Sequence, residues 1–256
     1  MQRRVTCFRV VTYNLHKGFS GSRPRRFVLH QMRHALAGLD ADFVLLQEVL
    51  GEHRGHARRE REWPEEPQFE FLADSLWPHH AYGRNAVYDA GNHGNAILSR
   101  APLGECSNIP VSPYPFAASR SLLHGVARIP DTAVDLHLIC VHFGFLSVER
   151  RPQIAKLCAH IDSAVPGDAP LLVAGDFNDW SARAEQHFNK ALGLTEAHRA
   201  LHGRFARTYP AWSPLLPLDR IYVRGLEIRR AERLAGAPWR SLSDHVPLIA
   251  DLALCP

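Results

Sequence analysis

Residues 171–178 read Leu-Leu-Val-Ala-Gly-Asp-Phe-Asn, an apolar run that leads directly into Asp176 and Asn178. A short continuous apolar run is typical of a strand that is covered on both faces. Charged and amide side chains beside a buried strand are costly unless they are paired or bind a metal ion. The segment therefore predicts a buried strand whose end contributes to a polar site.

Four further segments of the chain repeat this arrangement. The polar residues that end or directly precede apolar runs there are Asn14, Glu48, His142, Asp244 and His245. One such ending could be an accident or a cap. The repetition indicates that several strand ends converge on one polar site.

The remaining pattern predicts the layers around that site. Apolar, strand-like runs occur at residues 8–13, 43–47, 95–99, 124–129, 134–141, 171–174, 220–223 and 248–254. Helical periodicity occurs at residues 28–39, 68–77, 147–165 and about 182–192. Between residues 95 and 141 several strands follow one another without a helix, which excludes a simple doubly wound sheet. We therefore expect an α/β (α+β) fold in which outer helices cover mixed sheets.

Composition limits the class of protein. The chain has 256 residues and no repeat or linker, so we expect one domain over residues 1–256. No apolar stretch approaches the roughly 18–20 residues of a membrane-spanning helix, and we expect no signal peptide. The five cysteines form no C-x-x-C pair, which favours a reducing, cytoplasmic compartment. A net charge of +4 permits a phosphate-bearing substrate without requiring one.

The residue types at the strand ends restrict the chemistry. Asn, Asp and Glu oxygens suit Mg²⁺ or Mn²⁺ better than zinc. A histidine beside an aspartate can be held in one tautomer and polarised. The chain has no G-x-x-x-x-G-K-[ST] loop, no G-x-S-x-G elbow and no cysteine-phosphatase loop. Metal ligands and histidines without a serine or cysteine nucleophile indicate attack of water on a phosphate ester.

An ordered set of short motifs resembles the endonuclease/exonuclease/phosphatase superfamily. The motifs are Thr-Tyr-Asn (12–14), Leu-Gln-Glu-Val (46–49), Gly-Asn-Ala-Ile-Leu-Ser-Arg (94–100), Val-His-Phe-Gly (141–144), Gly-Asp-Phe-Asn (175–178), Leu-Asp-Arg-Ile (218–221) and Ser-Asp-His (243–245). Each motif alone is weak evidence for the family, but the ordered set is specific. The sequence as a whole is most similar to an uncharacterised bacterial branch. The resemblance implies a DNase I-like four-layer sandwich, with two packed mixed β-sheets between helices and a site at one edge.

The resemblance also implies roles for individual residues. Those that resemble metal ligands of the family are Glu48, Asn14 and Asp244, and the implied cofactor is Mg²⁺ or Mn²⁺. Those that resemble catalytic residues are Asp176 for the attacking water, Asn178 for a phosphoryl oxygen, His245 with Asp219 to orient it, and His142 near the phosphate. Asn95 and Arg120 are further candidates for contacts with the substrate phosphate. The number of metal ions and the general base stay open.

The substrate also stays open among phosphate esters. We favour a nuclease-like phosphodiesterase, for which the arginines of residues 23–26 supply part of a basic track. A phospholipid, sphingolipid or inositol-phosphate hydrolase shares the chemistry but needs an apolar rim, for which the candidates are Trp212, Leu215 and Leu216. A non-catalytic binding module on the same fold is disfavoured, because every expected catalytic residue type is present. No obligate protein partner is evident.

Three expectations concern geometry. The site residues come from distant segments and should lie within about 10 Å of one another, because a shared metal shell demands crowding. The Asp219 carboxylate should accept a hydrogen bond from the His245 imidazole, which would fix the tautomer. Lys17, by contrast, is typical of a solvated loop residue.

Overall fold

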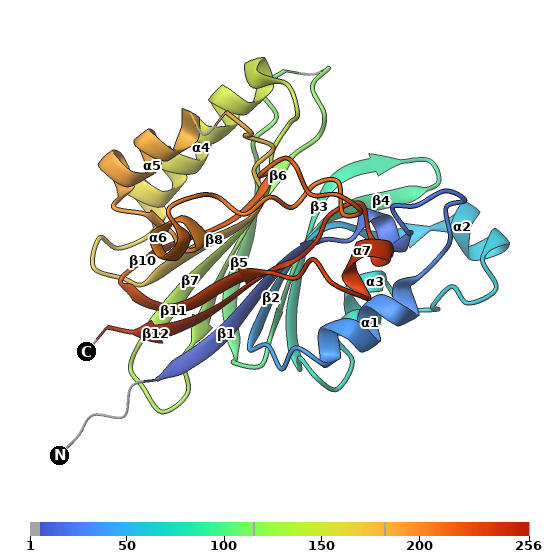
Figure 1. Ribbon diagram of the computed structural model, residues 1–256, viewed down its shortest axis with the longest axis horizontal. Coiled ribbons are helices and arrows are strands. Elements are labelled where there is room, and N and C mark those ends of the chain that lie inside the picture. Colours follow the sequence, from blue (N-terminus) through green and yellow to red (C-terminus); the bar gives the residue numbers. More distant parts are fainter. Residues whose placement is uncertain (1–5, 115, 182, 256) are drawn as a thin grey trace.

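The computed structural model of the protein describes residues 6–114, 116–181 and 183–255, whose strands form two six-stranded sheets (Figure 1). The first sheet has the order β11 (Leu226–Arg233), β12 (Leu248–Leu254), β1 (Cys7–Asn14), β2 (Phe43–His53), β4 (Gly91–Ser99) and β3 (His79–Tyr88). The second has the order β5 (Leu103–Pro110), β6 (Ser121–Arg128), β7 (Asp135–His142), β8 (Leu171–Asp176), β10 (Asp219–Arg224) and β9 (Thr195–Glu196). Both sheets are mixed, since β1–β2 and β7–β8 are parallel pairs among antiparallel ones.

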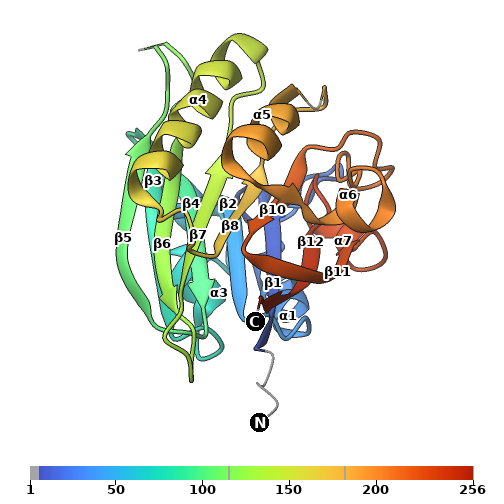
Figure 2. The same cartoon turned by 90° about the vertical axis from the view of Figure 1, so that its left-hand side faces the viewer.

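Helices cover the outer face of each sheet, so the molecule has four layers (Figures 1 and 2). On the first sheet lie α1 (Leu29–Ala37), α3 (Gln68–Ala73) and α7 (Trp239–Leu242). On the second lie α4 (Ser147–Ala164) and α5 (Arg183–Leu192); Ala182, where the expected last helix begins, is outside the described residues. The connections contain η1 (His16–Gly18), α2 (Arg54–Arg59) and α6 (Ala197–His202). The expected four-layer sandwich is confirmed.

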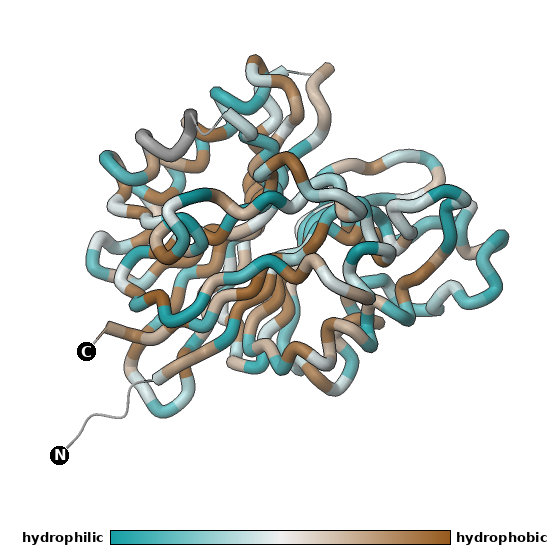
Figure 3. Tube along the Cα trace, in the orientation of Figure 1, coloured by the Kyte–Doolittle hydropathy of each residue, from teal (hydrophilic) through white to brown (hydrophobic). Residues whose placement is uncertain are grey.

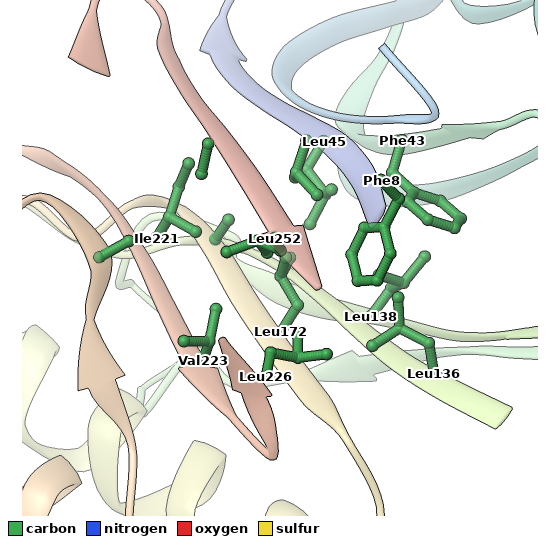
Figure 4. Packing of buried hydrophobic residues seen from close by; sticks show 14 of the residues in the cluster. Phe8, Phe43, Leu45, Leu136, Leu138, Leu172, Ile221, Val223, Leu226 and Leu252 are labelled. Atoms are coloured by element: carbon green, nitrogen blue, oxygen red, sulfur yellow. The ribbon is translucent and has the colours of Figure 1, made fainter. Parts of the chain in front are cut away.

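The inner core lies between the two sheets (Figure 4). There Phe8 and Phe43 of the first sheet pack with Leu138 and Leu172 of the second. Alternate residues of the same strands, such as Val44, point outward and pack under the helices. Because both faces of the central strands are covered, their sequences are continuously apolar. Figure 3 shows these central strands largely in brown, and no described helix is long and apolar enough to cross a membrane.

Strand direction brings the polar strand ends to one edge of the sandwich. The parallel strands β1 and β2 run toward that edge, as do β7 and β8, whereas the antiparallel β10 and β12 begin there. In register, His142 and Asp219 both lie opposite Asp176. We call this edge the functional edge. The start of β1 and the end of β12 lie at the opposite end of the sheets (Figure 1).

Candidate active site

The functional edge gathers buried polar side chains from both sheets. Asn14 ends β1, His142 ends β7, Asp176 ends β8 and Asp219 begins β10, and all four are buried. Asn14 Nδ2 donates a hydrogen bond to Asp176 Oδ2 at 3.2 Å. Since Asn14 belongs to the first sheet and Asp176 to the second, both sheets contribute to one site.

Asp176 is the centre of this arrangement. Its Oδ1 accepts a hydrogen bond from the backbone N–H of Asn178 at 2.9 Å. Its Oδ2 lies 3.6 Å from His142 Nε2 and 3.9 Å from His245 Nε2. Burial raises the pKa of the Asp176 carboxyl, and the neighbouring His245 cation opposes that rise. The carboxylate is therefore a stronger base than an exposed aspartate.

The turn after β8 needs backbone conformations that few residues adopt. Gly175 has φ +145°, and a Cβ atom there would lie 2.0 Å from the Val141 carbonyl oxygen. Glycine lets β8 approach β7 this closely, which fixes the position of the following aspartate. Asn178 has φ +50°, a left-handed conformation that asparagine tolerates. Its Nδ2 donates to the Phe143 carbonyl oxygen at 3.0 Å, which holds the amide at the site.

His245 and Asp219 form the hydrogen bond that the sequence predicts. His245 Nδ1 donates to Asp219 Oδ2 at 2.7 Å, which leaves Nε2 on the side of Asp176. Burial alone would lower the pKa of the imidazole, but the carboxylates around it, chiefly Asp219, outweigh burial and raise the pKa to about 10. His245 is therefore a cation at neutral pH.

His142, by contrast, is neutral, although it faces the same aspartate. Burial lowers its pKa well below the ordinary value, and the Arg120 and His245 cations lower it further. Its Nδ1 has no hydrogen-bond partner among the described residues. Asp176 thus lies between a cationic and a neutral histidine, which is an arrangement that separates acid and base roles.

Glu48 reaches the site through an irregularity in β2. The pairing of β2 with β4 shifts register between Leu46 and Val49, and Glu48 has φ +54°. Such strain in a non-glycine residue persists only where the surroundings hold it, and it is frequent at active sites. Lys17 Nζ lies 3.8 Å from Glu48 Oε2. Lys17 is partly exposed, as expected of a solvated loop residue, but its amine also faces this carboxylate.

Asp244 lies on the loop that leads into β12. The neighbouring Ser243 Oγ donates to the Asn14 carbonyl oxygen at 2.7 Å, which ties this loop to the end of β1. His16 Nδ1 lies 3.8 Å from Asp244 Oδ1. Gly21 packs on the same loop, since a Cβ atom there would lie 2.5 Å from the Asp244 backbone.

The donor set fits a hard divalent cation. Glu48, Asn14 and Asp244 offer carboxylate and amide oxygens, the ligands that Mg²⁺ and Mn²⁺ prefer. Both carboxylates face a basic side chain, which marks them as positions that attract positive charge. Ligand atoms of Asp176, Asp219 and His245 also lie within 4.8 Å of one another. Within that trio, however, Asp219 and His245 are already bonded to each other, and the imidazole is cationic.

The two candidate phosphate contacts differ in their surroundings. Asn95 is buried in β4, and its Nδ2 donates across the sandwich to the Ser121 carbonyl oxygen at 3.0 Å. That bond joins the two sheets, so a phosphate contact of Asn95 stays a prediction. Arg120 faces the site: burial lowers the pKa of its guanidinium, and the Glu48 and Asp176 carboxylates counteract this.

Three basic side chains at the site were not foreseen as site residues. Besides Lys17 and His16, His93 of β4 lies near Glu48, and burial lowers its pKa to about 4. Its Nδ1 has no hydrogen-bond partner among the described residues. The glycines on either side of Asn92 and His93 are the available signal, because they mark an irregular segment.

Comparison with known proteins decides the family. A sequence model described as the endonuclease/exonuclease/phosphatase family matches residues 11–245. The chain belongs to this family. Enzymes of the family act on phosphoesters and typically use divalent metal ions. The resemblance seen in the ordered motifs is thus confirmed.

Individual relatives agree with this assignment. The chain is 44% identical over 253 residues to the uncharacterized protein YbhP of Escherichia coli (strain K12), and the match covers 99% of both chains. An endonuclease/exonuclease/phosphatase structure from Beutenbergia cavernae has a TM-score of 0.78 at 19% identity and covers 97% of this chain and 72% of that one. A mannosyl-6-phosphatase from Bacteroides thetaiotaomicron has a TM-score of 0.70 at 18% identity, over 96% and 99%. These structures share the fold of this chain.

Proposed function

We propose that this protein is a Mg²⁺- or Mn²⁺-dependent phosphodiesterase that hydrolyses its substrate by attack of water on phosphorus. One observation carries the proposal: the buried Asp176 lies between the cationic His245 and the neutral His142. A base beside a positively charged donor is what an in-line displacement at phosphorus requires, since a proton leaves water while negative charge grows on the phosphoryl oxygens.

The proposed metal ligands are Glu48, Asn14 and Asp244. A cation bound there would polarise the phosphoryl oxygen and neutralise charge on the ester. Residues of the chain would position the water and the phosphate. Asp176 orients the water and accepts its proton, and Asn178 holds a phosphoryl oxygen through its amide. Arg120 and Lys17 add positive charge on the side of Glu48.

His245 has two proposed tasks. As a cation, it offsets charge on the phosphoryl oxygens, and its Nε2–H, on the side away from Asp219, gives its proton to the leaving oxygen as the bond from phosphorus to that oxygen breaks. Asp219 keeps the imidazole in that orientation and supports its charge. His142, being neutral, donates one hydrogen bond to the phosphate without adding charge.

Two classes of phosphodiester are candidate substrates. A nucleic acid suits the arginines of residues 23–26, which are exposed at positions 23, 25 and 26. A phospholipid suits an apolar surface at the site, because Trp212 and Leu215 are exposed on the segment that contacts Asp244 and His245. Leu216, the third rim candidate, is only partly exposed and pairs with Tyr209. Inositol phosphates and phosphate monoesters remain for comparison. Cytoplasmic location and folding of residues 1–256 as one domain stay predictions.

A hydrolysis panel tests this function. The substrates are bis-p-nitrophenyl phosphate, plasmid DNA, RNA, phosphatidylglycerol, an inositol phosphate and mannose 6-phosphate, each with Mg²⁺ or Mn²⁺. We expect hydrolysis of at least one diester, its loss in excess chelator, and its recovery when the metal is restored. The variant Asp176→Asn keeps the shape of the site and should be inactive. Full activity in chelator, or faster hydrolysis of the monoesters than of any diester, contradicts the proposal.

A further inference from the structure

The segments around the functional edge carry large apolar side chains that the core does not use. Among the described residues, eleven large apolar side chains are exposed, and ten of them lie on segments at this edge. Six of these ten lie on the segments that follow β5, β7 and β8 and precede β10, and we call them the apolar rim: Phe116, Phe145, Leu146, Trp180, Trp212 and Leu215. Single exposed apolar residues are ordinary, but a group of them on one face marks an interaction surface.

The apolar rim borders the site on two sides. On one side, the ring of Phe145 lies 4.8 Å from that of Trp180, two residues beyond Asn178. On the other side, the backbone N–H of Ala211 donates to the Asp244 carbonyl oxygen at 2.7 Å, which places Trp212 next to the site. The aromatic side chains therefore flank the site residues on two sides of the functional edge.

Exposed arginines stand among these apolar side chains. The loop that carries Arg23, Arg25 and Arg26 packs on Asp244 through Gly21. Arg240 Nη2 donates to the Trp212 carbonyl oxygen at 2.8 Å, and Arg151 is exposed in the first turns of α4. Positive charge thus lies at the same edge of the molecule as the aromatic rings.

We propose that the apolar rim is a membrane-docking surface that sets the functional edge on an anionic phospholipid bilayer. Tryptophan, phenylalanine and leucine together with arginine form the pattern of a protein surface that enters the headgroup layer of an acidic membrane. A purely electrostatic nucleic-acid track, by contrast, needs no leucine at the contact.

Docking would place lipid phosphodiester groups directly at Asp176. This consequence rests on the proposed function, whereas the docking itself does not. Phe116 is 99% exposed, Trp212 67% and Phe145 56%, so these side chains can enter a bilayer without rearrangement of the core. Leu201, 45% exposed on α6, lies against β11 and away from the rim, and so serves as a matched control.

Vesicle flotation in EDTA tests the docking apart from catalysis. Wild-type protein is mixed with vesicles of phosphatidylglycerol and phosphatidylcholine, or of phosphatidylcholine alone. We expect binding to the anionic vesicles and weaker binding to the neutral ones, because the arginines contribute to the affinity. The double variant Phe145→Ser/Trp212→Ser should lose about tenfold or more in affinity, since two aromatic side chains no longer enter the bilayer. The control Leu201→Ser should bind as the wild type does.

Each outcome bears on the proposal. If thermal melting finds the double variant unfolded, the fully exposed Phe116→Ser replaces it and should lose affinity severalfold. No binding of the wild type to anionic vesicles, or equal losses in the rim and control variants, overturns the proposal. So does tight binding of oligothymidylate in EDTA that the rim variants abolish while vesicles do not bind. Vesicle binding without hydrolysis of bis-p-nitrophenyl phosphate in Mn²⁺ supports docking and contradicts only the proposed function.

Discussion

Two buried histidines in different parts of this molecule differ in charge: His245 is cationic and His124 is neutral. At the functional edge, His245 bonds to a carboxylate. Under α4, on the outer face of the second sheet, the imidazole of His124 in β6 contacts two other histidines: its Nδ1 lies 2.9 Å from His160 Nε2, and its Nε2 lies 3.0 Å from His137 Nδ1. We call these three residues the histidine chain.

The contrast teaches that partners, rather than burial, decide the charge of these histidines. Burial lowers the pKa of His124 to about 4, and the neighbouring His160 and His137 lower it further. His245 is buried as well, yet the Asp219 carboxylate and its neighbours raise its pKa to about 10. A carboxylate at hydrogen-bond distance therefore separates the cationic His245 from the neutral His124.

The largest expected effect is on catalysis. His245→Ala and Asp219→Ala should each lower kcat by roughly 10²–10⁴. The first substitution removes the imidazole, and the second removes the carboxylate that orients it and supports its charge. The double variant should lose far less than the product of the two losses, since the residues act as a unit. Hydrolysis of bis-p-nitrophenyl phosphate in Mn²⁺ measures all three.

The histidine chain supplies the control for this cycle. His124→Ala with His137→Ala removes another hydrogen-bonded pair without touching the site, so kcat should stay at the wild-type value. Melting temperatures must establish that all variants fold. Strictly multiplicative losses at His245 and Asp219 in folded variants would refute the pairing.

The next effect is on protonation itself. In nitrogen-detected NMR at pH 8, His245 should be doubly protonated while His124 is neutral. Asp219→Asn should lower the pKa of His245 by about two units or more, because the neutral amide no longer opposes burial. A neutral His245 at pH 8 in the wild type would remove the difference between the two regions.

The third effect is on stability in acid. The pKa of His124 is lower in the folded chain than in the unfolded one, so below pH about 6.5 the unfolded state binds more protons. Stability should then fall as the pH drops from about 6.5 to about 4. His124→Gln, measured by thermal melting in EDTA, should reduce the loss between pH 7 and 5 by about 2–4 °C. The exposed His34→Gln should leave that loss unchanged.

The smallest effect concerns Lys17, whose charge is partly exposed. Lys17→Met should raise KM about threefold with little change in kcat, since a screened charge near Glu48 contributes less than a buried pair. Steady-state kinetics measure the split, and Lys190→Met on α5 is the control. A kcat loss as large as that of His245→Ala would mean that Lys17 belongs to the reacting centre.

Central strands could be predicted from the sequence and edge strands could not. The apolar runs at residues 8–13, 171–174 and 248–254 correspond to β1, β8 and β12. The strands without a predicted run are β3, β5, β9 and β11, which are the four edges of the two sheets. An edge strand has one neighbour and an exposed side, so it alternates or is polar throughout, as in Leu-Gly-Glu-Cys-Ser-Asn-Ile-Pro at residues 103–110.

The residues of the candidate site also differ in how well the sequence predicts them. Asp176 ends a central strand and His245 shortly precedes one, where the contrast with the apolar run makes them visible, whereas Asp219 is indicated only by the family resemblance. Lys17 and His93 come from short irregular segments whose place is fixed by bulges and positive φ angles, such as that of Glu48. No periodicity in the sequence reports such local geometry, so these residues could be placed only in three dimensions.

The hydrogen bond from Asn14 to Asp176 crosses from one sheet to the other. Neither sheet alone contains the site, because Glu48 and Asn14 belong to the first and Asp176 and Asp219 to the second. A folding intermediate in which one sheet has formed without the other would have strands and helices but no catalytic centre. During refolding, the return of activity therefore times the docking of the two halves, a step that backbone spectroscopy alone would not separate from strand formation.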